Sequence, residues 1–236
     1  MDLPVYLAMT PGEFQGSQAL PRHTGWMSCH FSAFTSGLSG LPRQLPEGSI
    51  LILDDALPMA EHDSNRIAEE LAQFLNTNTI DGLLLDFQRE PTRQAHLLAE
   101  QLTSLPCPVA MPEAYAANRS CAVFLPPCPG YVPLGEYVKK WDGRSIWLEI
   151  ALSSHQLILT ETGCQIEERS FDFAPAYEDE KLCCHYDMTL EADRAIFHLC
   201  RTRDDLQSLL TQAQGLGICK AVGLYQELGT QVKTSG

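Results

Sequence analysis

The chain has 236 residues, in which 30 Asp and Glu outnumber 16 Lys and Arg, so the net charge is −14 and the pI is near 4.8. This acidic balance argues against a nucleic-acid partner and against binding to an anionic membrane surface, because both attract basic proteins. Hydrophobic residues make up 44% of the chain and charged residues 19%, which favours a compact domain over a disordered chain.

The cysteines and the first residues indicate the compartment and the chemistry. Nine Cys are too few for a disulfide scaffold, and none forms a Cys-x-x-Cys pair, so we expect free thiols in a reducing cytoplasm and no metal. Residues 1–6 lack the pattern of a secretory signal, and no apolar run reaches the ~18 residues of a membrane span. No nucleotide-binding glycine loop or serine-hydrolase motif occurs, so no cofactor is expected.

Short apolar runs recur along the chain and predict strands that are buried on both faces. They lie at residues 4–9, 25–31, 49–54, 80–87, 108–111, 122–125, 145–151 and 220–225. Long connections separate these runs, which is typical of a parallel sheet covered by helices.

Four helices are predicted between the strands. Apolar residues at helical spacing follow Ser64, and a second such pattern runs over residues 92–104. A short helix is expected over residues 134–141, and a last one begins at the Thr-x-x-Asp capping pattern of residues 202–205. Residues 10–48 carry many Gly and Pro without a helical period, so the connections on either side of the strand at 25–31 are expected to be loops.

Residues 152–200 interrupt this alternation. The runs 156–160 and 165–170 flank a turn and predict a β-hairpin, and residues 195–199 predict a further strand. The sequence therefore predicts one α/β domain over residues 1–236. Its fold is a (β/α)8 TIM-type barrel, reduced because its first half has few helices, with a small antiparallel insertion at 152–200 between strands seven and eight.

Active sites of such barrels lie at the carboxyl ends of the strands. The candidate site residues are therefore the polar and aromatic side chains that finish or follow the predicted strands. They are Thr10, His30, Asp54, Asp55, Asp86, Gln88, Glu113, Glu149, Tyr225 and Glu227.

The fourth predicted strand carries a recognisable motif. Residues 81–88 read Asp-Gly-Leu-Leu-Leu-Asp-Phe-Gln, which resembles the Asp-Gly-x-Asp-x-Asp-x-Glu motif of the chitinase-type family 18 glycoside hydrolases at Asp81, Gly82 and Asp86. The final helix and strand, and the position of the insertion, are also similar to those of the family. The resemblance implies a glycan or related small molecule as ligand, with Asp81 among the residues that bind it.

The departures from the motif concern its chemistry. The family's general acid is the final Glu, and the amide of the matching Gln88 cannot take over a role typically worth ~10²–10⁴-fold in rate. Leu84 replaces the middle Asp. By resemblance, Asp86 matches the Asp that orients the substrate's N-acetyl group, and Tyr225 matches the Trp on which the sugar stacks.

Several candidates also have a plain structural interpretation. Asp86 and Gln88 can serve only to satisfy hydrogen bonds at the barrel rim or in its interior, and Asp54 can cap the loop that follows it. His30 is more often a packed, hydrogen-bonded side chain than a base.

Glu149 is more unusual, because it stands in an apolar strand. Such a carboxylate must either line a polar pocket or be paired, and Glu149 is the best substitute for the missing acid. Glu227 faces either the pocket or a nearby loop.

Three functions remain open on this evidence. The favoured one is a catalytically degenerate barrel that binds a glycan through Asp86 and Tyr225 without cleaving it. The second is a divergent glycosidase in which Glu149 or Glu227 supplies the acid and Asp86 orients the substrate. The third is a non-catalytic interaction or structural protein whose pocket is plugged by Gln88 and Tyr225.

The insertion is rich in acidic and aromatic residues. The acidic ones predict a solvated surface. They are Glu161, Glu167, Glu168, Glu178, Asp179 and Glu180. The aromatic side chains of Phe171, Phe173 and Tyr177 either cover the hairpin or form a face for a protein partner.

Overall fold

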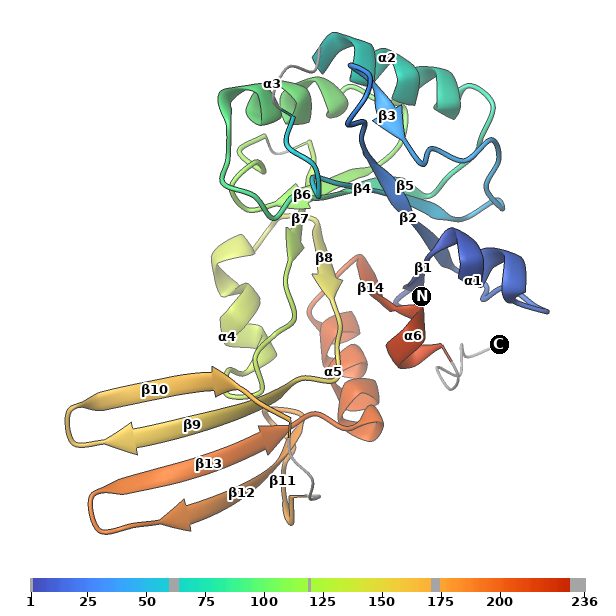
Figure 1. The fold of residues 1–236 in the computed structure, drawn as a ribbon. Coiled ribbons are helices and arrows are strands. Elements are labelled where there is room, and N and C mark those ends of the chain that lie inside the picture. Colours follow the sequence, from blue (N-terminus) through green and yellow to red (C-terminus); the bar gives the residue numbers. More distant parts are fainter. Residues whose placement is uncertain (1, 60–63, 119, 171–174, 230–236) are drawn as a thin grey trace.

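The computed structural model describes residues 2–59, 64–118, 120–170 and 175–229 (Figure 1). Eight parallel strands form a barrel. In chain order they are β1 (Val5–Met9), β2 (Thr24–Phe31), β4 (Ile50–Asp54), β5 (Gly82–Asp86), β6 (Val109–Pro112), β7 (Ala122–Leu125), β8 (Ile146–Glu149) and β14 (Lys220–Leu224). The barrel closes because β1 pairs with β2 on one side and with β14 on the other. All eight predicted strands, and with them the TIM-type barrel, are confirmed.

The helices lie in the connections between these strands. They are α1 (Pro11–Gly16), α2 (Ser64–Leu75), α3 (Arg93–Leu102), α4 (Leu134–Val138) with a following 3₁₀ turn (Lys139–Trp141), α5 (Arg203–Gly215) and α6 (Tyr225–Leu228). The four predicted helices are confirmed, including the reciprocal capping bonds between Thr202 and Asp205 at the start of α5. The longest helix has 13 residues, so no described helix has the length and hydrophobicity that a bilayer crossing needs.

The expectation that the connections within residues 10–48 are loops without regular structure is wrong. The Thr10 hydroxyl accepts a bond from the Glu13 N–H (3.3 Å), and the Glu13 carboxylate accepts one from the Thr10 N–H (2.7 Å). This reciprocal capping starts α1, and Pro11 fits its first turn because the missing N–H would have no partner there. In addition, β3 (Leu38–Ser39) pairs antiparallel with the end of β2.

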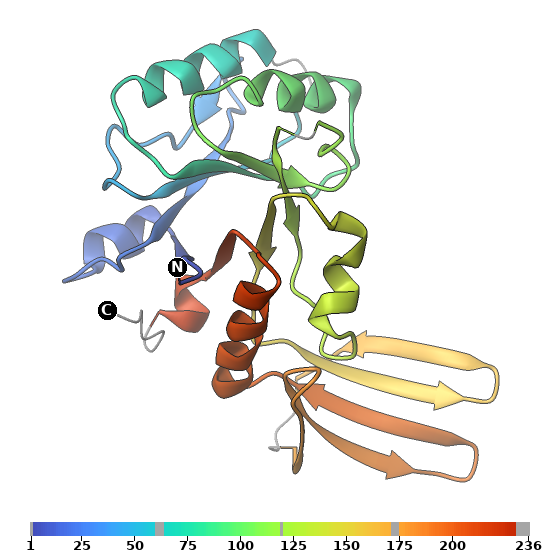
Figure 2. The same ribbon diagram turned by 180° about the vertical axis from the view of Figure 1, so that it is seen from behind.

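The insertion is a five-stranded antiparallel sheet. Its strands are β9 (Ser154–Thr160), β10 (Gly163–Glu168), β11 (Tyr177–Asp179), β12 (Cys184–Leu190) and β13 (Arg194–Cys200), in the spatial order β10-β9-β13-β12-β11. The predicted hairpin and third strand are confirmed, whereas β11 and β12 were not foreseen. Figures 1 and 2 show α4 and α5 between the barrel and this sheet, and α2 and α3 over the opposite side of the barrel.

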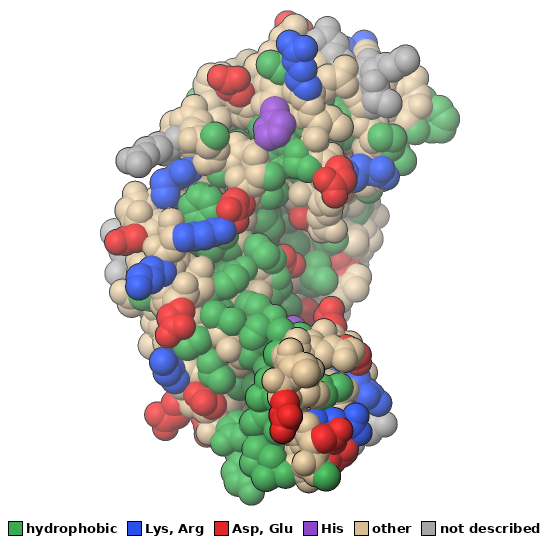
Figure 3. Space-filling view, turned by 90° about the vertical axis from the view of Figure 1, so that its left-hand side faces the viewer, with side chains coloured by type: hydrophobic (Ala, Val, Ile, Leu, Met, Phe, Trp, Pro, Cys, Tyr) green, Lys and Arg blue, Asp and Glu red, His purple; other side chains and the backbone are tan. Residues whose placement is uncertain are grey.

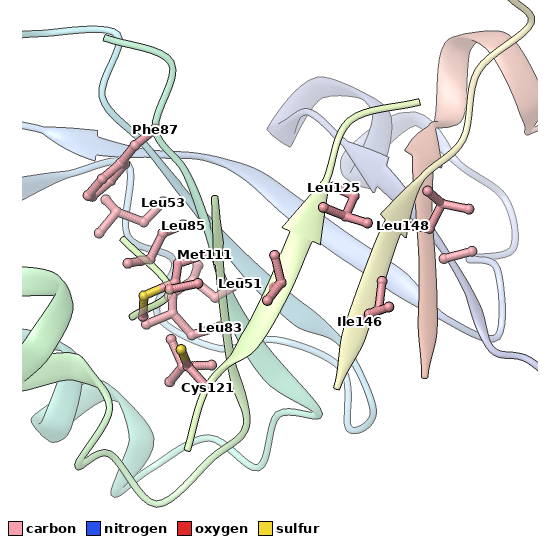
Figure 4. Packing of buried hydrophobic residues seen from close by; sticks show 14 of the residues in the cluster. Leu51, Leu53, Leu83, Leu85, Phe87, Met111, Cys121, Leu125, Ile146 and Leu148 are labelled. Carbon is pink, nitrogen blue, oxygen red and sulfur yellow. The ribbon is translucent and has the colours of Figure 1, made fainter. Parts of the chain in front are cut away.

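Alternate side chains of the barrel strands enter two separate hydrophobic clusters. In β4, Ile50 and Ile52 belong to the inner cluster within the barrel, whereas Leu51 and Leu53 belong to the outer cluster beneath the helices (Figure 4). Burial on both faces explains why these strands read as unbroken apolar runs. The inner cluster comprises Tyr6, Ala8, Ile50, Ile52, Leu84, Ala110, Ala122, Phe124, Trp147 and Val222, with Met27 packed against it.

Candidate ligand site

Three polar residues form a row at the carboxyl ends of neighbouring strands. His30 of β2 is in register with Asp54 of β4, and Asp54 is in register with Asp86 of β5. Ile52 and Leu84, two residues before the carboxylates, belong to the inner cluster. Because side chains alternate along a strand, Asp54 and Asp86 point to the same side as these residues, at the mouth of the barrel.

Glu149 reaches the same mouth from the other side of the barrel. It ends β8 two residues after Trp147 of the inner cluster, and it is half-buried. Burial, with the nearby carboxylates of Asp86 and Glu227, raises the pKa of Glu149 to about 7. Glu149 therefore lines a shared acidic mouth, and it exchanges its proton near neutral pH.

Asp86 is held by Gln88, which lies two residues further along the chain. The Gln88 side-chain amide donates to both Asp86 carboxylate oxygens, at 3.2 and 3.4 Å. Burial raises the pKa of Asp86, the bond from Gln88 lowers it, and the charges of Asp54 and Asp55 raise it, with a net increase. Gln88 itself is exposed, so it does not plug the barrel interior.

The adjacent Asp54 and Asp55 have different surroundings. Asp54 accepts a bond from the Ala56 N–H (2.9 Å), which is the loop-capping role that the sequence allowed. The Asp55 carboxylate is 8% exposed and accepts bonds from the N–H groups of Gln88 (2.8 Å) and Arg89 (3.0 Å). The Arg89 guanidinium donates back to the Asp55 carbonyl at 2.7 Å. Asp55 therefore positions the loop that carries Gln88.

The two candidates near the end of the chain lie in α6 rather than in a strand. Tyr225 begins this helix and packs against the outer cluster, and the Glu227 carboxylate accepts a bond from the Leu152 N–H. Leu224, by contrast, is in register with Ala8 of the inner cluster and is 42% exposed. The structure thus presents Leu224 at the mouth, at the place where Tyr225 was expected. The alternation in β14 was the signal that could have shown this.

Asp81 lies at the opposite end of the barrel from the other candidates. It precedes β5 and accepts a bond from the Tyr6 hydroxyl at 2.6 Å. The Lys220 amine donates to the Tyr6 oxygen (3.1 Å) and to the Asp81 carbonyl (2.8 Å), and it sits over the rings of Tyr6 and Trp147 at 4.7 and 4.9 Å. Burial raises the pKa of Tyr6 and lowers that of Lys220. Asp81 is therefore part of a closed network, which the structure does not bring together with Asp86.

Chemically, the mouth offers carboxylates, an amide and an imidazole. Such groups accept and donate hydrogen bonds to the hydroxyls of a polar ligand. In the part of the chain that the structure describes, no group of three His, Cys, Asp or Glu side chains is arranged to hold a metal ion.

The chain was compared with known proteins at the level of sequence and of structure. No protein-family model matches its sequence, and no curated protein matches it. Solved structures do resemble it. A family 18 N-acetylglucosaminidase from Paenibacillus barengoltzii matches with a TM-score of 0.60 at 10% identity, covering 98% of this chain and 96% of that one.

Two further structures show the same likeness. A chitinase from Chromobacterium violaceum matches with a TM-score of 0.56 at 9% identity, over 98% of this chain and 96% of that one. The spore cortex-lytic enzyme SleL of Bacillus cereus matches with a TM-score of 0.54 at 9% identity, over 94% of this chain and 70% of that one. The protein therefore has a glycoside hydrolase-like barrel fold.

Proposed function

We propose that the protein binds a glycan at the carboxyl end of its barrel and does not cleave it in the manner of family 18 enzymes. The observation that carries this proposal is the pair of bonds from the Gln88 amide to Asp86 at the end of β5. An amide at this position orients the carboxylate but has no proton to give to a leaving group. The likeness of the fold to an N-acetylglucosaminidase and a chitinase supports a glycan as the ligand class.

Thermal unfolding in the presence of sugars tests this proposal. We expect oligomers of N-acetylglucosamine to raise the Tm, because a ligand at a hundred times its Kd adds ~2.7 kcal/mol, or about 5–10 °C for a protein of this size. Asp86→Ala should abolish the shift, whereas Asp142→Ala, an exposed position outside the site, should preserve it. The absence of any shift with these oligomers would refute the proposal.

If the site lacks only a general acid, restoring one should create hydrolytic activity. Gln88→Glu restores the residue type of the family's acid and, because the side chain is exposed, should not disturb the fold. We expect this variant to hydrolyse an aryl chitobioside slowly. Adding Leu84→Asp would not help, because Leu84 is buried in the hydrophobic inner cluster, where an unpaired carboxylate is costly. A folded variant that binds the substrate without turnover would argue against the disarmed site.

A second candidate function is a divergent glycosidase with Glu149 as its acid. The observation that favours it is the pKa of Glu149, raised to about 7 by burial and by the carboxylates of Asp86 and Glu227. A general acid works best when its pKa lies near the operating pH. The wild-type protein would then hydrolyse the aryl chitobioside with a rate that falls as pH rises above about 7, and Glu149→Gln would remove that activity. If the wild-type protein binds the substrate and does not turn it over, this candidate is excluded.

A further inference from the structure

The five-stranded sheet has one apolar face. Two rows of side chains cross the four longer strands in register. One row consists of Ile166, Leu157, Phe197 and Met188, and the other of Cys164, Leu159, Ala195 and Leu190. We call these eight residues the apolar sheet face. Neighbours in such rows point to the same side of a sheet, so the eight side chains form one continuous surface.

This face is open to solvent over much of its area. The exposed fraction is 40% for Leu159, 44% for Ile166, 47% for Met188 and 70% for Leu190. Figure 3 shows hydrophobic side chains continuing down to the lower end of the molecule, where this sheet lies. Exposed apolar patches of this extent are uncommon on a protein that works alone, and they mark interaction sites.

The described chain covers the base of the sheet but not this face. At the base, the Cys184 thiol donates to the Gly130 carbonyl (3.2 Å), and Tyr131 packs edge-on against His155. The described residues on either side of 171–174 are anchored on the other, polar side. There, Arg169 donates to Gln156 (3.2 Å), and the Asp187 carboxylate accepts a bond from the Ala176 N–H (3.3 Å).

Residue register places these two anchors on the polar side. Gln156 and Asp187 share a row with Glu167 and His198, one position away from the apolar row. Phe171 and Phe173, which the sequence suggested as part of a partner-binding face, lie outside the described residues. Tyr177 is 58% exposed and packs against Tyr186.

The perimeter of the apolar sheet face is acidic. Acidic residues occupy the β9–β10 turn, the edge strands β10 and β11, and the β12–β13 turn. They are Glu161, Glu168, Asp179, Glu180, Glu191 and Asp193, and Glu167 and Glu178 add negative charge on the polar side of the two edge strands. The basic side chains in the described part of residues 154–200 are three, and all are engaged: Arg169 with Gln156, Arg194 with Glu191, and Lys181 with Glu136. The net charge of the perimeter is therefore strongly negative.

We propose that the apolar sheet face binds an amphipathic helix of a partner protein, whose apolar stripe is flanked by Lys and Arg. The apolar rows would bury the stripe, and the acidic perimeter would pair with the basic flanks. Four strands spaced by 4.7–4.9 Å present a surface that a helix of about ten to fourteen residues spans. A helix packed on one face is the usual way to cover such a sheet.

The charge of the perimeter decides between occupants. A second copy of this chain would bring the same acidic perimeter against itself, and the surface of an anionic membrane would be repelled in the same way. Like charges placed opposite one another suppress the wrong partner. A basic helix is the occupant that removes the repulsion.

Two synthetic peptides test the proposal on the full chain. Both are amphipathic helices with the same leucine stripe, flanked by Lys in one peptide and by Glu in the other. We expect the Lys-flanked peptide to bind roughly tenfold more tightly or better in fluorescence anisotropy, with the difference shrinking as salt is added. Equal affinity for the two peptides, or no binding of the Lys-flanked peptide, would overturn the proposal.

A matched pair of double variants tests the location. Ile166→Lys with Leu190→Lys places two charges on the apolar sheet face, and Gln165→Lys with Thr189→Lys places them one residue away on the polar side of the same strands. We expect the first variant to lose binding roughly tenfold or more and the second to retain it. An equal loss in both would show that charge alone matters. If the first variant fails to fold by circular dichroism, Leu190→Lys against Thr189→Lys gives the same comparison at more exposed positions.

The other occupants give distinct results. Sedimentation of the wild-type protein as a dimer that Leu190→Lys dissociates would assign the face to a second copy and overturn the helix proposal. Binding to vesicles of phosphatidylcholine with phosphatidylserine, lost in Leu190→Lys and kept in Thr189→Lys, would assign it to a membrane and overturn the proposal as well. The helix proposal is supported if the protein is monomeric, does not bind the vesicles and binds the Lys-flanked peptide more tightly than the Glu-flanked one.

Discussion

The two ends of the barrel use polar side chains in opposite ways. At the amino end, the Tyr6 hydroxyl donates to the Asp81 carboxylate, and the Lys220 amine donates to the Tyr6 oxygen and the Asp81 carbonyl and lies over two aromatic rings. At the carboxyl end, burial, together with nearby carboxylates, raises the pKa of Glu149 and Asp86. Paired groups at the amino end of such barrels serve stability, whereas perturbed groups at the carboxyl end are typical of binding and catalysis. Four variants separate these two roles.

The largest effect on stability should come from the amino end. Trp147 is buried inside the barrel, where its ring packs beneath Lys220 and beside Gly82. Trp147→Ala should lower the free energy of unfolding by about 3–5 kcal/mol, because it leaves a large cavity and frees the amine. Urea denaturation measures this, with Trp141→Ala as the control at a less buried tryptophan. A loss below about 1 kcal/mol in Trp147→Ala would contradict the proposed role of this end.

The hydroxyl of Tyr6 should contribute less than the ring of Trp147. Tyr6→Phe keeps the packing but removes the donor to Asp81 and the acceptor of Lys220. We expect the free energy of unfolding to fall by about 1–3 kcal/mol, the usual cost of leaving buried polar groups unpaired. Tyr177→Phe, at an exposed tyrosine of β11, should leave the unfolding curve unchanged. If Tyr6→Phe and Tyr177→Phe gave similar unfolding curves, the hydrogen bonds of the Tyr6 hydroxyl would not contribute to stability.

At the carboxyl end, removing a charge should stabilise the protein. The folded pKa of Glu149 lies near 7, above its ordinary value of 4.5, so the folded state binds this proton more tightly than the unfolded state. Stability from this group is therefore present below about pH 4.5 and is lost as the pH rises to about 7. Glu149→Gln should raise the free energy of unfolding by about 1–2 kcal/mol at pH 8, after allowance for solvent screening.

Wild type and Glu149→Gln also test how the free energy of unfolding depends on pH. The difference in stability between Glu149→Gln and wild type should grow between pH 4.5 and 7 and stay constant above. Urea denaturation at several pH values follows it. A difference that is independent of pH would mean that folding does not change the pKa of Glu149, and a variant destabilised at pH 8 would mean that its carboxylate makes a favourable interaction.

The smallest effect on stability is expected at Gln88. Its side chain is exposed, so Gln88→Ala should change the free energy of unfolding by less than about 0.5 kcal/mol. The variant should nevertheless raise the pKa of Asp86, because the lost amide bonds favour the carboxylate. Carboxyl carbon NMR titration would detect this change. An unaltered Asp86 titration would mean that the amide does not hold the carboxylate in solution.

The structure agrees with the sequence-based predictions where a single local pattern determines the element. The unbroken apolar runs predicted the barrel strands, because burial on both faces leaves no room for polar residues. The Thr-x-x-Asp pattern predicted the start of α5 at Thr202. The Thr-x-x-Glu pattern at Thr10 was an equally local signal for α1, and it was overlooked because of the Gly and Pro around it. Strand β11 has only three residues and therefore no readable period, whereas β12 alternates apolar and polar residues over Cys184–Leu190, a strand signal that was overlooked.

The candidate site was harder to predict, because it depends on register. A position near a strand end does not say which end of the barrel a side chain reaches, and Asp81 and Asp86 lie at opposite ends although they are five residues apart. Leu224 rather than Tyr225 reaches the mouth because side chains alternate along β14, and Val222 of the inner cluster lies two residues before Leu224. Asp54 bonds within its own loop, whereas Asp55 accepts bonds from the backbone of Gln88 and Arg89, a contact between distant segments that the strand pattern does not show.

Closure of the barrel has a consequence for how the protein is made. The strands β1 and β14 pair directly, so the barrel closes only when Val5 comes into register with Ala221. At a synthesis rate of about 5–20 residues per second, β1 emerges from the ribosome roughly 10–40 seconds before its partner exists. During that time one edge of the growing sheet is unpaired and open to other chains. Nascent chains of this protein should therefore depend on chaperones until the segment that follows α5 has been translated.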